Sequence, residues 1–160
     1  REAMLALNPL VAVHALHQRA DEAALMRLVA DADVVIDCCD NFATRHAVNR
    51  ACVKHKKPLV SGAGVRFDGQ IAVFDMRDAK APCYACLFPE DSQSEEVRCA
   101  VMGVFAPLTG IVGCIQAAEA LKILMSVGQP LAGRLMLVDA LTMDIRTIRL
   151  KKDAACAGCG

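Results

Sequence analysis

The sequence predicts an α/β protein with a Rossmann-like, mostly parallel sheet, flanking helices and antiparallel strands towards the C-terminal end. Two observations support this prediction. The first half of the 160 residues alternates short β-branched runs with segments of helical spacing, which is typical of a parallel sheet covered by helices. The second half contains three further strand-like runs, two of which follow one long helix.

Each element of the first half has a local signal. Residues 11–15 form a short apolar run that predicts a strand, and residues 21–30 place their apolar side chains on one helical face. Residues 34–38 are a continuous apolar run with β-branched members, as in a strand buried on both faces. A helix over residues 44–55 and a strand at residues 58–61 complete a βαβαβ order.

The second half predicts further strands around a long helix, with antiparallel strands towards the C-terminal end. The expected strands are residues 70–75, 135–139 and 143–150. The helix covers residues 107–125, and Pro107 suits its first turn. Gly62 and Gly64 are expected to form a turn, since Phe67 occupies the third glycine position of a dinucleotide-binding fingerprint. The acidic segment 88–98 lacks periodicity and is expected to be an exposed loop.

Composition excludes several classes of function. The 18 basic and 18 acidic residues cancel, and there is one Tyr and no Trp, so we expect no nucleic-acid partner. The apolar run 99–115 is shorter than the ~20 residues that a membrane span needs, and polar Gln116, Glu119 and Lys122 follow it at helical spacing. We therefore expect no membrane partner. Nine cysteines without a secretory signal favour a reducing, cytoplasmic location.

Two Cys-x-x-Cys units give the strongest chemical signal. They are Cys83 with Cys86, and Cys156 with Cys159. Four thiolates suit tetrahedral Zn²⁺ and leave no open position, so the predicted role is structural. Disulfides or a redox pair are the alternatives, but neither unit opens a helix after a strand as a thioredoxin-type motif does. Such a Cys₄ zinc site would tie the tail of the chain to its middle.

A second signal lies where the strand at residues 34–38 gives way to a helix. Asp40 and Asn41 follow that strand directly. Carboxyl ends of parallel strands form the ligand crevice of such sheets, and an aspartate there can bind Mg²⁺ on nucleotide phosphates. Alternatively, Asp40 or Asn41 only caps the helix. The spacing favours neither interpretation.

Asp40-Asn41-x-x-x-Arg45 resembles the signature of the HesA/MoeB/ThiF family, the bacterial relatives of ubiquitin-activating enzymes. The resemblance covers nearly the whole chain and includes several motifs in the family's order. The matching segments are residues 8–9, 33–38, 69–70, 83–89, 116–120 and 156–159.

The resemblance implies that residues 1–160 are the C-terminal portion of one ThiF-type adenylyltransferase domain, with the Gly-rich ATP loop in a missing N-terminal half. ATP and Mg²⁺ would serve to adenylate the C-terminal glycine of a ubiquitin-like sulfur carrier with a Gly-Gly tail, in thiamin or molybdopterin biosynthesis. Asp40 would be the catalytic residue that binds Mg²⁺ and phosphate, and Asn41 a nucleotide contact. Arg45 would face phosphate or brace Asp37 or Asp40.

Cys99 occupies a place where family members often carry a cysteine for sulfur or acyl transfer, although simple packing is an alternative. The resemblance also implies a homodimer and a sulfur-donor protein as partners. Because the phosphate-binding half is missing, we expect the fragment alone to be inactive. The same absence supports an alternative function, a non-catalytic, zinc-stabilised module that docks a ubiquitin-like carrier.

Overall fold

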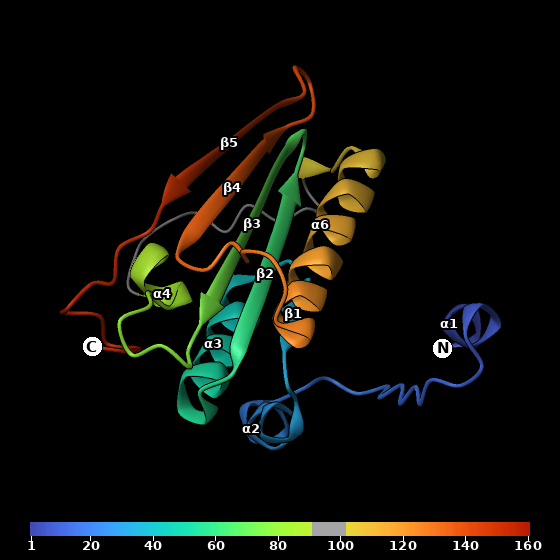
Figure 1. Cartoon of the computed structure of the whole chain (residues 1–160), viewed down its shortest axis with the longest axis horizontal. Coiled ribbons are helices and arrows are strands. Elements are labelled where there is room, and N and C mark those ends of the chain that lie inside the picture. Colours follow the sequence, from blue (N-terminus) through green and yellow to red (C-terminus); the bar gives the residue numbers. More distant parts are fainter. Residues whose placement is uncertain (91–101) are drawn as a thin grey trace.

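Five strands form one sheet in sequence order: β1 (Val35–Asp37), β2 (Pro58–Val65), β3 (Asp68–Asp75), β4 (Arg134–Asp139) and β5 (Asp144–Arg149). The helices are α1 (Glu2–Leu7), α2 (Glu22–Asp31), α3 (Phe42–His55), the short α4 (Tyr84–Leu87) and the long α6 (Ala106–Met125) (Figure 1). The structure is a computed structural model, and it describes residues 1–90 and 102–160.

The sheet is mixed. β1 pairs with β2 in parallel through α3, whereas β2–β3, β3–β4 and β4–β5 are antiparallel. The α/β class, the flanking helices and the antiparallel C-terminal strands are therefore confirmed, but the sheet is not mostly parallel. The physical reason is the link from β2 to β3. Val65 pairs with Asp68, so only Arg66 and Phe67 connect the strands, and a parallel pair needs a crossover of about a dozen residues or more.

Helices cover both faces of the sheet. Leu59 and Phe74 belong to a core shared with α2, α3 and α4. Their chain neighbours Val60 and Val73 belong to a second core shared with α6. Since successive side chains of a strand point to opposite faces, α3 and α6 lie on opposite sides of the sheet (Figure 1). The three-layer arrangement places the loop after β1 between these two helices.

Two local predictions were wrong. Residues 11–15 form neither strand nor helix, and α1, before them, buries no residue and lies away from the sheet (Figure 1). An isolated apolar run has no strand to pair with there. Gly62 and Gly64 lie inside β2, which continues to Val65. The turn comes later, at Arg66, whose φ of 50° is left-handed.

Among the described residues, α6 is the one helix that is long and apolar enough to cross a membrane, a weak indication by itself. One face of α6 packs against the sheet and includes the buried polar residues Gln116 and Glu119. Glu119 accepts the Leu131 backbone N–H at 2.6 Å and pairs with Lys122. These contacts are those of a helix that belongs to a folded α/β core.

Candidate functional site

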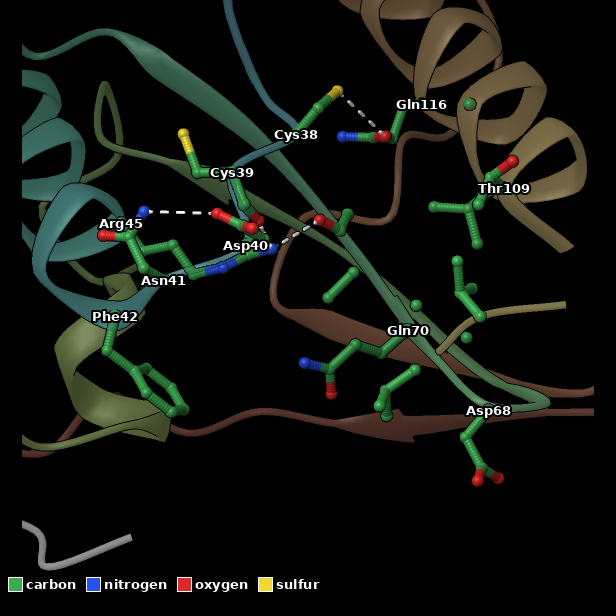
Figure 2. Close-up of a pocket in the computed structure, with 18 of the residues that line it drawn as sticks. Cys38, Cys39, Asp40, Asn41, Phe42, Arg45, Asp68, Gln70, Thr109 and Gln116 are labelled. Carbon is green, nitrogen blue, oxygen red and sulfur yellow. Dashed lines mark hydrogen bonds between the residues drawn. The ribbon is translucent and has the colours of Figure 1, made fainter. Parts of the chain in front are cut away.

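A cavity of about 620 Å³ opens where the parallel strands β1 and β2 end. Its walls come from the loop after β1, the second half of β2, the start of β3 and the first half of α6 (Figure 2). Open α/β sheets bind ligands at the carboxyl ends of their parallel strands. The volume suits a small-molecule ligand, since such sites span about 300–1,000 Å³.

The loop between β1 and α3 places a carboxylate at this cavity. Asn41 is the N-cap of α3, and its Oδ1 accepts the backbone N–H of Thr44 at 2.8 Å. Asp40 lines the cavity, is exposed, and accepts a hydrogen bond of 3.4 Å from Nδ2 of Asn41. The helix cap is therefore Asn41, and the Asp40 carboxylate is left facing the cavity (Figure 2).

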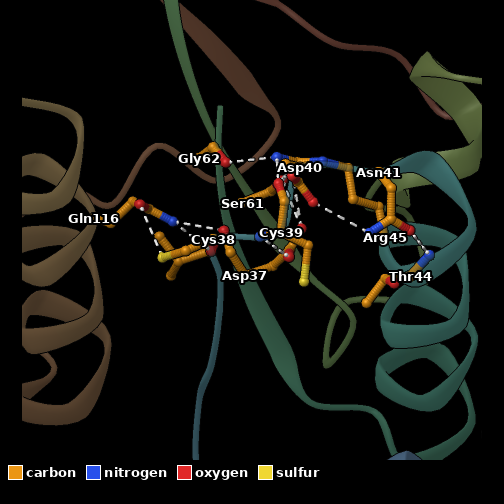
Figure 3. Close-up of polar contacts among 11 residues, drawn as sticks. Asp37, Cys38, Cys39, Asp40, Asn41, Thr44, Arg45, Ser61, Gly62 and Gln116 are labelled. Carbon is orange, nitrogen blue, oxygen red and sulfur yellow. Dashed lines mark hydrogen bonds and ion pairs between the residues drawn. The ribbon is translucent and has the colours of Figure 1, made fainter. Parts of the chain in front are cut away.

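Beneath the loop, Arg45 forms a buried ionic network (Figure 3). Its Nη1 lies 3.1 Å from Asp37 Oδ2 and donates to Ser61 Oγ at the same distance. Its Nη2 donates to the carbonyl of Gly62 at 2.9 Å and to the carbonyl of Cys39. Arg45 thus joins the end of β1 and the loop to β2. Arg45 therefore braces Asp37, and because it also lines the cavity, its contact with phosphate stays a prediction.

Gln116 closes the other side of the network from α6. Its Nε2 donates to the carbonyls of Asp37, at 2.9 Å, and Val60, at 3.2 Å, and its Oε1 lies 3.5 Å from the Cys38 thiol. Gln116 is 2% exposed. Sequence reasoning gave it no role in the site, although the helical spacing of Gln116, Glu119 and Lys122 in a largely apolar helix was a usable signal.

The cavity offers little positive charge. Among the described residues that line it, Arg45 is the one cation, and it is already paired with Asp37. Burial, together with Asp37, raises the pKa of the Cys39 thiol to about 12, so Cys39 stays protonated at neutral pH. A polyphosphate here would need positive charge from outside this set of residues.

The four predicted metal ligands come together. The thiols of Cys83, Cys86, Cys156 and Cys159 all lie within 4.8 Å of one another. Individual sulfur–sulfur distances are 3.7 Å for Cys83–Cys156, 4.0 Å for Cys83–Cys86 and 3.5 Å for Cys86–Cys159. A zinc tetrahedron with Zn–S bonds of about 2.3 Å has edges of about 3.8 Å. These three edges lie close to that value, so the four thiols are placed to hold a tetrahedral metal ion.

The surroundings of these thiols also suit a metal. Cys83 is fully buried and Cys156 is 8% exposed. Burial raises the pKa of the Cys83 thiol. Burial also acts to raise the pKa of Cys156, but the hydrogen bonds from the backbone of Gly158 and Cys159 and from the thiols of Cys86 and Cys83 together outweigh it and lower the pKa. Backbone N–H groups directed at a sulfur favour the thiolate, which is the form that binds metal.

Cys99 and most of the predicted loop 88–98 lie outside the described residues, which omit 91–101. The predicted part of Cys99 in transfer chemistry therefore stays a prediction from the sequence.

Curated relatives of this chain are adenylyltransferases. The chain is 40% identical over 163 residues to the molybdopterin-synthase adenylyltransferase of Escherichia coli K12, covering 100% of the chain and 64% of the relative. The sulfur carrier protein adenylyltransferase of Thermus thermophilus is 45% identical over 159 residues, with coverages of 97% and 59%. The sulfur carrier protein ThiS adenylyltransferase of E. coli K12 is 42% identical over 154 residues, with coverages of 96% and 60%. The chain spans less than two thirds of each relative.

Solved structures share the fold. E. coli MccB with ATP superposes with a TM-score of 0.80 at 20% sequence identity, covering 99% of this chain and 48% of that chain. MccB with MccA-N7isoASN gives a TM-score of 0.82 at 19% identity, with coverages of 99% and 50%. Identities this low establish the fold alone. The family model matches residues 1–158, nearly the entire sequence. The chain therefore belongs to the ThiF family.

Proposed function

We propose that the protein to which this chain belongs adenylates the C-terminal glycine of a ubiquitin-like sulfur carrier, in molybdopterin or thiamin biosynthesis. The observation that carries the proposal is the exposed Asp40 carboxylate at a nucleotide-sized cavity. The curated relatives support it, because they are named molybdopterin-synthase and sulfur-carrier adenylyltransferases. The partner would be a carrier whose Gly-Gly tail reaches this cavity.

The proposed reaction forms one bond and breaks one. An oxygen of the carrier's terminal carboxylate attacks the α-phosphorus of ATP, the bond to the β-phosphate breaks, and pyrophosphate leaves. Mg²⁺, when bound, neutralises phosphate charge, and Asp40 is the residue of this chain that would hold it. Asn41 keeps Asp40 in place through their hydrogen bond and the cap of α3. Arg45 acts beneath the loop, through Asp37 and the Cys39 carbonyl.

We also propose that the four-cysteine site binds structural Zn²⁺. Four thiolates fill a tetrahedral coordination sphere and leave no position for a catalytic water. The metal would therefore stabilise the fold and take no part in adenylation. Sulfur transfer through Cys99 with a separate sulfur donor and a homodimeric assembly are further parts of this proposal that rest on the family resemblance. A cytoplasmic location is a further part that rests on the cysteine content.

A second candidate function is a module that docks the carrier without catalysis. The scarcity of positive charge in the cavity favours it, because its one described cation is paired with Asp37. In that case the cavity would hold the carrier's glycine tail alone, and no phosphate chemistry would occur at Asp40.

Carrier-dependent exchange of labelled pyrophosphate into ATP tests the proposal. We expect Asp40→Ala to lower the exchange rate of the full-length protein by about 100-fold or more, since a group that stabilises transferred phosphate contributes on this scale. Asp31→Ala is the matched control, because Asp31 is an exposed aspartate at the end of α2, away from the cavity lining. Exchange that persists in Asp40→Ala would reject the role of Asp40. A full-length protein that binds the carrier without any exchange would favour the docking module.

A further inference from the structure

Asn49 is a fully buried polar residue that has no role in the adenylation reaction proposed above. It lies on α3, two turns after the N-cap Asn41, and it is 0% exposed. Asn49 is not among the residues that line the cavity, and its side chain contacts the N-terminal end of α4, where Cys83 is the N-cap. A buried amide at this place must be satisfied by specific partners, because an unpaired polar group in the interior is strongly destabilising.

Both ends of the amide contact the first Cys-x-x-Cys unit. Asn49 Oδ1 accepts the backbone N–H of Tyr84 at 2.9 Å. Its Nδ2 donates to the sulfur of Cys83 at 3.7 Å. The first bond fixes the orientation of the amide, since a backbone N–H requires an oxygen opposite it. The amide must therefore present its NH₂ group to the Cys83 sulfur.

The second Cys-x-x-Cys unit lies against the same amide. A methyl group added at Gly158 would lie 3.6 Å from Nδ2 of Asn49 and 3.4 Å from the Cys83 sulfur. Gly158 lies between Cys156 and Cys159, so Asn49 sits where the two halves of the four-cysteine site meet. Tyr84, which Asn49 holds, also lines the nucleotide cavity.

We infer that Asn49 is a positioning residue for the metal: it holds Cys83 in place as a ligand and ties the four-cysteine site to helix α3. A neutral N–H donor stabilises a metal-bound thiolate and orients it. Such outer partners typically change metal affinity by about 10–100-fold. The inference rests on the metal site proposed above and is independent of the adenylation reaction.

Chelator competition on the purified full-length protein loaded with Zn²⁺ tests this inference. Asn49→Asp keeps the size and the acceptor for Tyr84 N–H but replaces the donor with an oxygen beside Cys83. Asn49→Ala removes both contacts. We expect each variant to bind Zn²⁺ about 10–100-fold more weakly than wild type. Val48→Ala is the matched control, because Val48 is the neighbouring buried residue of α3, 5% exposed, and its loss perturbs the core without touching a donor to sulfur.

A spectroscopic measurement distinguishes a role of Asn49 in positioning Cys83 from a general loss of protein stability. In Co²⁺-loaded protein, loss of the N–H donor changes the electron density on the Cys83 sulfur. We therefore expect the sulfur-to-cobalt charge-transfer band to shift in Asn49→Asp and to stay in place in Val48→Ala. Unchanged Zn²⁺ affinity and an unchanged band in both Asn49 variants would overturn the inference, as would a folded wild-type protein that takes up no Zn²⁺. Neither measurement involves ATP or a carrier, so pyrophosphate exchange remains a separate test of adenylation.

Discussion

The Arg45–Asp37 pair illustrates how single residues hold the site together. The two side chains are 7% and 1% exposed, so the ion pair is shielded from water. Arg45 also satisfies the Gly62 carbonyl and Ser61. A buried pair need not add net stability, but removing one partner leaves an uncompensated charge and typically costs about 3–5 kcal/mol.

We accordingly expect Arg45→Ala to lower the free energy of unfolding by about 3–5 kcal/mol in urea titrations. The double variant Arg45→Ala with Asp37→Ala removes both charges, and we expect it to be more stable than Arg45→Ala alone. A double variant that is less stable by the sum of the two single losses would show that the pair is not coupled.

Among the elements, α6 and β2 pack closely because Gly62 has no side chain. A methyl group at Gly62 would overlap the carboxamide of Gln116. Gln116 cannot move aside cheaply, since its Nε2 satisfies the buried carbonyls of Asp37 and Val60. The glycine thus lets the helix reach the ends of both parallel strands.

Gly62→Ala is therefore expected to reduce the free energy of unfolding by about 1–3 kcal/mol through overpacking. Gly110→Ala in α6 is the control, because we expect it to raise the free energy of unfolding instead of lowering it. A methyl group there meets nothing within 4 Å, and alanine in place of glycine stabilises a helix by roughly 0.5–1 kcal/mol. Parallel thermal melts measure both changes. Equal effects of the two substitutions would refute the close approach at Gly62.

At the scale of the whole molecule, local patterns predicted the elements well and long-range relations poorly. Helical spacing placed α2, α3 and α6 to within a few residues, because an apolar stripe is visible in one stretch of sequence. The direction of each strand was harder to predict from the sequence. The residue pattern of two neighbouring strands is the same whether a hairpin or a crossover joins them. Gly62 and Gly64 were predicted to form the turn, but they belong to β2 and the turn lies at Arg66.

The residues of the candidate site also fall into those that a local motif predicts and those that only the fold brings together. Asp40, Asn41 and the four cysteines stand in short motifs, so the sequence displays them directly. Gln116 contacts the Asp37 carbonyl from 79 positions away, and only the packing of α6 on the sheet brings them together. Asn49 contacts Cys83 of the four-cysteine site from a helix of ordinary composition. Residues that act across elements in this way carry little local signal.

The four-cysteine site joins α4 in the middle of the chain to the tail after β5. A metal bound there would close a long loop, since Cys83 and Cys156 are 73 positions apart. Structural zinc contributes on the order of 10 kcal/mol to folding in small domains. We expect Cys156→Ser with Cys159→Ser to lose bound Zn²⁺ and to melt about 10 °C lower or more. The exposed Cys114 gives the control: Cys114→Ser is expected to keep both metal and melting temperature. Metal analysis and thermal melts check these outcomes, and a double variant with wild-type values for both would mean that the thiols bind no structural metal.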